Sequence, residues 1–259
     1  MLFINTRPQD RAEELSHALR LAHIDVVDLP LLELLPQAWS EDLSALYRQL
    51  PDAQVIVVVS PTAVQIGMAY LKQSGITLDQ LQHIQWIAVG DRTAQALAQY
   101  GISAEVPKVE TSEGMLQLPV LQTLNSGQCL AFWRGEGGRM FMMDQLKQQG
   151  MQILNFVLYE RRCPVFTQQD LANIFSLLEK QKQYAMVVSS EAGWLNWIQL
   201  MQHQKHLIAK GHYLVLGERL YQVVSNYKKN QATCFNITRL TDLKTDSILQ
   251  KLVVVQGNT

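Results

Sequence analysis

The sequence has little that would support disulfide bonds, a metal site or a strongly charged surface. Its 259 residues include only three cysteines, Cys129, Cys163 and Cys234, which are far apart and form no paired CxxC motif. Neither a disulfide framework nor a zinc site is predicted from them. Basic and acidic residues nearly balance, 22 against 23, for a formal net charge of −1. Without a basic excess, neither a nucleic acid nor an acidic membrane surface is an expected partner.

Long apolar runs and a leader pattern are also missing. No apolar segment approaches the roughly 20 residues that a membrane-spanning helix needs. The chain opens on a short strand-like segment, residues 1–4, rather than on a basic stretch followed by a longer apolar one, so no secretory signal is expected. Together with the unpaired cysteines, this pattern predicts a cytoplasmic protein.

Two motifs of common enzyme classes are incomplete. Gly135 and Gly137 match the first two glycines of a dinucleotide-binding fingerprint, but Met140 occupies the third position, where a bulky side chain would obstruct packing of the helix on the strand. A nucleotide-dependent enzyme is therefore a weak alternative. No GxSxG motif surrounds Ser189 or Ser190, so a hydrolytic serine is not predicted.

A histidine pair does not complete a metal site. His203 and His206 are three residues apart, a spacing that fits a metal. Polar neighbours on either side are typical of a solvated helix end, and no further ligand lies nearby in the sequence. These histidines are therefore interpreted as surface residues.

What the sequence does contain is an internal repeat at half its length. Arg7 and Arg134 follow similar strands 127 positions apart, Gly90 and Gly217 are also 127 apart, and Ser60 matches Ser189 at 129. Each landmark follows a short apolar run. A duplicated α/β unit with matched turns predicts two similar domains facing one another, with a ligand held where those turns converge.

Hydrophobic patterns predict strands alternating with helices. Residues 55–59 are a run of β-branched residues without alternation, which is typical of a parallel strand covered on both faces. Residues 31–35, between Pro30 and Pro36, are interpreted as a segment that leaves the first domain. The predicted strands are 2–5, 24–29, 55–59, 84–89, 101–106, 130–133, 153–159, 185–188, 213–216 and 233–237. The predicted helices are 9–21, 61–71, 94–98, 140–148, 170–180, 191–201, 218–227 and 244–254.

Four strand-to-helix turns are candidate anion sites. The first turn of a helix has free N–H groups and a positive dipole end, which attract carboxylate or phosphate oxygens. Simple helix capping is the alternative for each turn taken alone, but four turns matched in pairs favour a ligand. The turns are Ser60-Pro61-Thr62, Gly90-Asp91-Arg92-Thr93, Ser189-Ser190-Glu191 and Gly217-Glu218-Arg219.

Arginines also gather in or beside turns, where their guanidinium groups could bind carboxylates bidentately. Solvation or pairing with Asp or Glu is the alternative for some of them. Arg161 and Arg162 are the weaker candidates and are interpreted as linker surface. The others, with Gly135, complete the predicted ligand-binding residues: Arg7, Arg92, Arg134, Arg139 and Arg219.

In order and spacing, several of these segments resemble the uroporphyrinogen-III synthase family across almost the whole chain. The segments are Asn5-Thr6-Arg7-Pro8, residues 59–64, residues 88–90 with Thr93, Ala94 and Leu97, residues 134–139 with Leu146, residues 158–162 and residues 188–192.

The resemblance implies an α/β fold of two similar domains, each a parallel sheet flanked by helices, joined by a two-stranded linker. One lobe would combine residues 1–35 with 165–259, the other would hold 37–157, and the linker strands would be about 30–36 and 158–164. The repeat alone would place a boundary near Gly127. The resemblance also implies that the lobes close over the substrate without a cofactor or metal.

The activity implied is that of a lyase in haem biosynthesis. The family cyclises hydroxymethylbilane to uroporphyrinogen III, inverting the last pyrrole ring and losing water, whereas uncatalysed closure gives the wrong isomer. The enzyme must chiefly fold its substrate, which bears eight carboxylates suited to the turns and arginines above. Tyr159 matches a tyrosine of the family and is the candidate acid or positioning donor. The alternative is a tyrosine that packs the linker with its hydroxyl in water.

One departure and one rival hypothesis accompany the resemblance. The family pattern Gly-x-x-Thr-Ala is absent after Gly217, and Arg219 is a candidate replacement for the missing threonine. The rival is a non-catalytic two-lobed protein that binds a small molecule. For the enzyme we expect a monomer that receives hydroxymethylbilane by transient hand-over from hydroxymethylbilane synthase.

Overall fold

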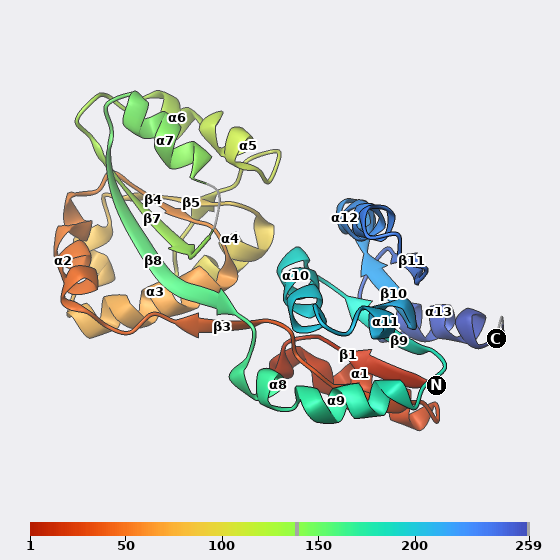
Figure 1. Cartoon of the computed structure of the whole chain (residues 1–259). Helices are drawn as coiled ribbons and strands as arrows, with labels where there is room; N and C mark the ends of the chain where they lie inside the picture. The colour runs from red at the N-terminus through yellow and green to blue at the C-terminus, as the bar shows by residue number, and fades with distance from the viewer. Residues whose placement is uncertain (138–139, 258–259) are drawn as a thin grey trace. The chain divides into compact units, whose positions relative to one another are not determined.

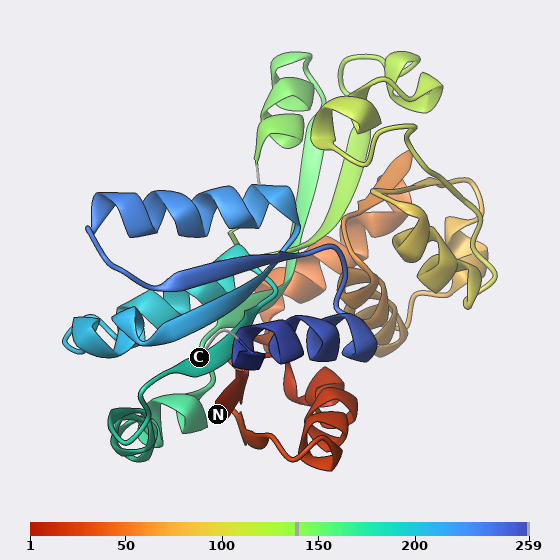
Figure 2. The same cartoon turned by 90° about the vertical axis from the view of Figure 1, so that its right-hand side faces the viewer.

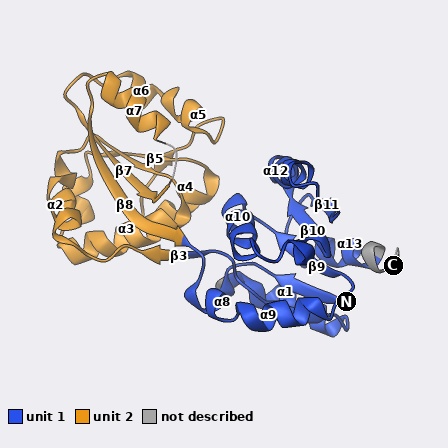
Figure 3. Ribbon diagram, in the orientation of Figure 1, with its two compact units in different colours: residues 1–33, 162–259 blue, residues 34–161 orange. Residues whose placement is uncertain are grey.

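The computed structural model describes residues 1–137 and 140–257, which form two compact units. Unit 1 comprises residues 1–33 and 162–259, and unit 2 comprises residues 34–161 (Figure 3). The chain therefore leaves unit 1 once, builds unit 2 completely and returns.

The described residues of unit 1 form a five-stranded sheet in the order β11-β10-β9-β1-β2 (Figure 1). All neighbouring strands are parallel. The strands are β1 (Leu2–Asn5), β2 (Asp25–Asp28), β9 (Tyr184–Val188), β10 (Gly211–Leu216) and β11 (Asn236–Leu240).

Helices cover both faces of this sheet, as a parallel sheet requires. Helix α1 lies beside α13 on one face, where Phe3 packs with Leu15 and Ile248 (Figure 2). Ile4 points to the opposite face, among residues of α9 to α12, because successive strand side chains alternate. The helices of unit 1 are α1 (Gln9–Leu21), α8 (Val165–Gln169), α9 (Leu171–Glu179), α10 (Glu191–Leu200), α11 (Lys205–Ala209), α12 (Gly217–Asn230) and α13 (Thr245–Gly257).

The described residues of unit 2 form a six-stranded sheet in the order β3-β8-β7-β4-β5-β6. Along the order β8-β7-β4-β5-β6, each strand is parallel to the next. The strands are β3 (Glu33–Pro36), β4 (Val55–Val58), β5 (Gln85–Ala88), β6 (Ala104–Glu105), β7 (Cys129–Gly135) and β8 (Gln152–Arg162).

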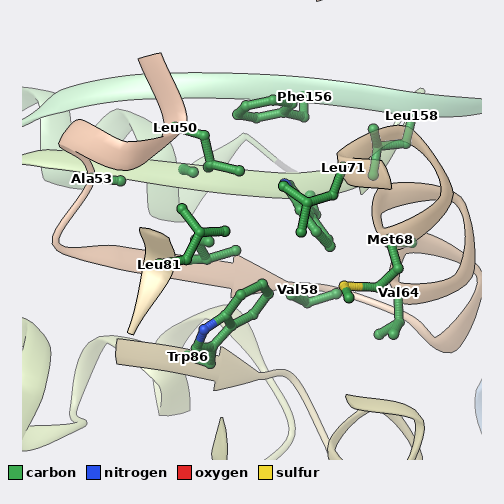
Figure 4. Close-up of a cluster of buried hydrophobic side chains, with 14 of the residues drawn as sticks. Leu50, Ala53, Val58, Val64, Met68, Leu71, Leu81, Trp86, Phe156 and Leu158 are labelled. Atoms are coloured by element: carbon green, nitrogen blue, oxygen red, sulfur yellow. The ribbon is translucent and has the colours of Figure 1, made fainter. Parts of the chain in front are cut away.

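Two apolar layers sandwich this second sheet. On one face, residues of α2, α3 and α4 pack on Ile56, Val58 and Trp133, as Figure 4 shows in part. On the other face, residues of α5, α6 and α7 pack on Val55 and Val57. The helices of unit 2 are α2 (Glu41–Gln49), α3 (Pro61–Ser74), α4 (Asp91–Ala98), α5 (Ser112–Leu116), α6 (Pro119–Gln122) and α7 (Phe141–Gln148), with 3₁₀ turns at Leu50–Asp52 and Leu78–Leu81. The predicted α/β class is confirmed.

The sequence repeat corresponds to a repeat of sheet order. The order β2-β1-β9-β10-β11 in unit 1 matches β8-β7-β4-β5-β6 in unit 2, so that β1 matches β7, β9 matches β4 and β10 matches β5. These are the pairs that the repeat brings together. The two strands that come first in unit 1 come last in unit 2, which makes the units circular permutations of one another. Because the matched turns all follow parallel strands, they lie at the carboxyl edge of each sheet.

Most predicted elements are confirmed to within a few residues, and the exceptions are short or depend on pairing. The strand expected at 233–237 instead begins at Asn236, where it pairs with His212 of β10. The strand expected at 101–106 shrinks to Ala104–Glu105. Helices α2, α5, α6, α8 and α11 were not predicted, since most of them are too short to show a helical period.

None of the described helices is long and apolar enough to cross a membrane.

Candidate functional site

Tyr159 lies at the carboxyl edge of unit 2, opposite the last residue of β7, and β8 runs on past the end of β7 to Arg162 (Figure 1). Its side chain is buried, with only 1% of the residue exposed. The hydroxyl lies 3.0 Å from Ser60 Oγ and accepts a hydrogen bond from Arg161 Nη2 at 3.3 Å. The structure therefore joins three residues of two strand ends around one phenol oxygen.

A β-bulge and a glycine make room for this phenol. Along β7 and β8 the register shifts after Arg134, so that Gly135 pairs with Tyr159. A Cβ on Gly135 would lie 2.4 Å from ring atom Cε2 and 2.9 Å from the hydroxyl. Any side chain at Gly135 would overlap the ring, so glycine is required here for the close approach of backbone to ring.

Ser60 is both a neighbour of Tyr159 and the N-cap of α3. Its Oγ accepts a hydrogen bond from Ala63 N at 3.1 Å. Pro61, the first helical residue, has no N–H, and the N–H of Thr62 has no partner within the helix because of its position in the first turn. Ser60 can therefore cap the helix while the Thr62 N–H, which has no partner within the helix, remains available to a ligand.

The guanidinium of Arg134 is a second one near Tyr159, in addition to that of Arg161. The residue is only 6% exposed, and its Nη1 contacts Met140 Sδ. Burial, and then the charge of Arg161, lower the pKa of the Arg134 guanidinium below its usual value. A bound anion would offset both effects, because it would compensate for the lost hydration and for the repulsion between the two cations.

The Gly90 turn already holds a carboxylate, from Glu110. Asp91 N, at the start of α4, donates to Glu110 Oε1 at 3.0 Å, and a Cβ on Gly90 would lie 2.4 Å from the carboxyl carbon. Of the other predicted residues in this turn, Arg92 is exposed and Thr93 is buried. Glu110 was not predicted from the sequence, because nothing local marks a residue that folds back over a helix start.

In unit 1, hydrogen bonds of the Asn5 side chain hold the turn that carries Arg7. Arg7 N donates to Asn5 Oδ1 at 3.3 Å, and the Asn5 amide in turn donates to Ser16 Oγ at 2.7 Å. Thr6 Oγ1 donates to Val187 O at 2.6 Å. Arg7 itself is half-buried. Buried polar bonds of this kind hold the turn in one conformation.

The other predicted turns of unit 1 lie at the same edge of its sheet. Ser190 caps α10 by accepting from Gly193 N at 3.1 Å, just as Ser60 caps α3, while Ser189 is half-buried. Glu191 accepts from Arg219 Nη2 at 2.5 Å. Gly217 has φ +72°, a left-handed conformation that favours glycine at the start of α12.

The Arg219–Glu191 ion pair joins two residues that were predicted to bind ligand. Their side chains are 79% and 43% exposed, so solvent screens the pair and it contributes little to stability. Arg219 is therefore able to exchange Glu191 for another carboxylate at small cost.

Two further predictions concern Arg139 and a metal site. Arg139 lies outside the described residues. Within residues 1–137 and 140–257, no cluster of three or more His, Cys, Asp or Glu side chains is arranged to hold a metal ion. His206 instead pairs with Glu179 at 2.5 Å.

A sequence model of a protein family covers most of the chain. It is described as uroporphyrinogen-III synthase HemD, and it matches residues 13–234. The chain belongs to this family. The uroporphyrinogen-III synthase of Escherichia coli (strain K12) is 27% identical over 227 residues, which are 85% of this chain and 89% of the relative. The enzyme of Synechococcus elongatus is 28% identical over 166 residues, 62% of this chain and 61% of the relative.

Solved structures of the uroporphyrinogen-III synthase family share the fold. A mutant uroporphyrinogen III synthase from the extremely thermophilic bacterium Thermus thermophilus superposes with a TM-score of 0.69 at 14% identity, covering 99% of both chains. The uroporphyrinogen-III synthetase of Helicobacter pylori 26695 gives a TM-score of 0.55 at 14% identity, covering 97% of this chain and 98% of that one. Family membership favours an enzyme over the non-catalytic binding protein considered above.

Proposed function

We propose that this enzyme of the uroporphyrinogen-III synthase family, a lyase that cyclises hydroxymethylbilane to uroporphyrinogen III with loss of water, carries out the chemical step beside Tyr159 in unit 2. The observation that supports this most is the enclosed phenol. Tyr159 is buried, fits against Gly135 and has its hydroxyl hydrogen-bonded to Ser60 and Arg161. Buried hydroxyls are hydrogen-bonded in general, so the location of this one supports the proposal: it lies beside the N-terminus of α3 and the Arg161 guanidinium.

Tyr159 is proposed as the proton donor to the leaving hydroxyl. When the terminal carbon–oxygen bond of the substrate breaks, the oxygen takes the phenolic proton and leaves as water. The carbon left behind is then attacked by the substituted carbon of the last pyrrole ring, which carries no hydrogen, and a spiro intermediate forms. That intermediate fragments and closes again through the free α-carbon of the same ring, which inverts the ring. The free α-carbon loses its proton at this second closure and the phenolate recovers one, so that the enzyme ends unchanged.

Arginines and helix N-termini are proposed to bind the carboxylates and so fold the substrate. In unit 2 these are Arg134, Arg139, the Ser60-Pro61-Thr62 turn and the turn of Gly90, Arg92 and Thr93. In unit 1 they are Arg7, the turn of Ser189, Ser190 and Glu191, and the turn of Gly217 and Arg219. Backbone N–H groups at a helix start bind anions whatever the side chains there are, which suits a polycarboxylate. Correct folding decides which carbon is attacked.

The same proposal extends to how the substrate arrives. Hydroxymethylbilane closes to the wrong isomer when left alone, so a short path from its source is an advantage. We therefore place the enzyme in the cytoplasm, as a monomer that receives the substrate from hydroxymethylbilane synthase by transient contact.

The test uses purified protein and freshly generated hydroxymethylbilane. After oxidation of the products, chromatography resolves the type I from the type III isomer. We expect the type III isomer to form at a rate proportional to enzyme concentration. Type I product alone, at the rate of the enzyme-free reaction, would refute the proposed activity.

A matched pair of arginine variants tests carboxylate binding. Arg134→Gln removes the buried guanidinium, whereas Arg48→Gln removes an exposed one that pairs with Glu41 on α2. We expect KM to rise about tenfold for the first, because hydrogen bonds between charged groups contribute roughly 1.5–3 kcal/mol, and to stay unchanged for the second. An unchanged KM in the Arg134 variant would remove that residue from the binding site.

A further inference from the structure

Arg161 lies on the same side of β8 as Tyr159, two residues further along. Side chains at positions i and i+2 of a strand point to the same face. In the structure the Arg161 guanidinium carbon lies 5.5 Å from the centroid of the Tyr159 ring, while its Nη2 donates to the phenol oxygen at 3.3 Å. Arg161 thus contacts Tyr159 through both ring and hydroxyl, which goes beyond its interpretation as linker surface.

The second arm of Arg161 reaches the loop that follows β7. Its Nη1 donates to Glu136 O at 3.2 Å, and Glu136 N donates to Tyr159 O at 2.7 Å. The planar guanidinium therefore bridges the phenol and the backbone just beyond the bulge at Gly135. A rigid fork with two acceptors fixes position better than a single contact does.

Donor and acceptor rules limit where the phenolic proton can go. A guanidinium only donates, so Arg161 occupies a lone pair of the Tyr159 oxygen. Ser60 Oγ accepts from Ala63 N and lies 3.0 Å from the phenol oxygen, and either of the two hydroxyls can donate to the other. In the arrangement in which Ser60 donates, the phenolic hydrogen points away from both neighbours.

We propose that Arg161 is a positioning residue, which holds the Tyr159 hydroxyl with its hydrogen directed toward the substrate. The inference rests on the proposed role of Tyr159 as proton donor. It adds that Arg161 orients the hydroxyl for that role. Arg161 would act on the chemical step and not on substrate affinity. The other role open to an arginine beside Arg134 is direct contact with a substrate carboxylate. Loss of such a contact would raise KM and leave kcat unchanged.

The experiment is a double-mutant cycle between Arg161→Gln and Tyr159→Phe, with kcat and KM measured for type III product. We expect Arg161→Gln to lower kcat about tenfold, as for loss of a hydrogen bond to a charged group, and to change KM less than about twofold. In the Tyr159→Phe background the same substitution should have no further effect on kcat, because residues that act as a unit are not additive. Arg161→Lys should restore part of the lost kcat, since it keeps one charged donor.

Each other outcome overturns the proposal, and in a distinguishable way. A rise in KM at constant kcat would make Arg161 a substrate contact. An equal loss of kcat with and without the Tyr159 hydroxyl would make it independent of Tyr159. Normal turnover by Tyr159→Phe would refute the proposed function of Tyr159 itself, whereas a slow Tyr159→Phe beside a fast Arg161→Gln would refute this inference alone. Should Arg161→Gln fail to fold by thermal melting, the Arg161→Lys variant decides by the same cycle.

Discussion

The ring of Tyr159 fills the space that a side chain on Gly135 would need. A Cβ at Gly135 would approach three ring and hydroxyl atoms to within 2.4–2.9 Å, closer than real Cβ contacts come. Because β7 and β8 are shifted in register at this point, the two residues are direct partners across the strands. The position of the phenol thus depends on the absence of one methyl group.

Gly135→Ala should therefore impair catalysis by displacing Tyr159. We expect kcat to fall by at least about tenfold, since shifts of about 1 Å in catalytic groups can cost 100-fold. Gly75→Ala is the control, because Gly75 also needs its glycine, at φ +79°, but has open space around it. That variant should lose about 1 kcal/mol of stability and keep its kcat. Equal kcat in the Gly135 variant and the wild type would contradict this account of the site.

Glu110→Gln should strengthen substrate binding. Its carboxylate occupies the start of α4, where we propose that a carboxylate of the substrate binds, so the two compete. Charge at a helix N-terminus contributes about 0.3–1 kcal/mol, which predicts a KM about two- to fivefold lower in the variant. Glu105→Gln, at an exposed glutamate of the same unit, controls for the change in net charge. If both variants shift KM equally, the competition at Gly90 does not occur.

Gly67→Ala should destabilise unit 2 although alanine favours helices. Gly67 lies in α3 against the buried Trp133 ring, and a Cβ there would be 2.2 Å from ring atom Cε3. Overpacking of this kind costs about 1–3 kcal/mol, more than the roughly 1 kcal/mol gained in helix propensity. Gln65→Ala, at an exposed position of the same helix, should leave the melting temperature unchanged or slightly raised. An equally stable Gly67 variant would mean that Trp133 can move aside.

His212 should make unit 1 less stable as the pH falls. Burial lowers its pKa in the folded protein, where Nε2 lies 2.8 Å from Thr238 Oγ1. The unfolded chain, whose histidines titrate near about 6.5, then binds more protons than the folded one. The stability due to neutral His212 is thus complete above that pH and declines as the pH falls below it.

Thermal melts at several pH values between about 5 and 8 test this effect. His212→Gln should flatten the decline on the acid side, while His17→Gln, at an exposed position of α1, should not. Parallel curves for His212→Gln and the wild type would rule out the contribution.

The sequence was sufficient for features that are encoded locally. The β-branched run at Val55–Val58 predicted a strand buried on both faces, and the turns at Ser60 and Ser190 were recognised from their capping residues. Features set by contacts between distant segments were not predictable. The start of β11 at Asn236 follows from its pairing with β10, and the approach of Glu110 to Gly90 joins residues of two loops. Helix α2 was missed although Ser40 caps it in the usual way.

The candidate site also depends on contacts between distant segments, which limits what the sequence can predict. Tyr159 was identified by resemblance alone, because a tyrosine in a strand carries no local sign of catalysis. Its partners depend on a one-residue shift between β7 and β8, which no hydrophobic period reveals. The contact of Arg161 with Glu136 O likewise joins β8 to the loop after β7, so a pattern within one strand does not predict it.

The most direct test of the account is the single-turnover rate of type III formation by Tyr159→Phe with enzyme in excess over hydroxymethylbilane. Tyr100→Phe, which alters an exposed tyrosine of unit 2, is the matched control. We predict that Tyr159→Phe slows the step at least about tenfold at unchanged melting temperature. This threshold is set below the roughly 100-fold that general acids usually contribute, because folding of the substrate carries most of the selectivity. A Tyr159→Phe enzyme that forms type III product as fast as the wild type would contradict the account.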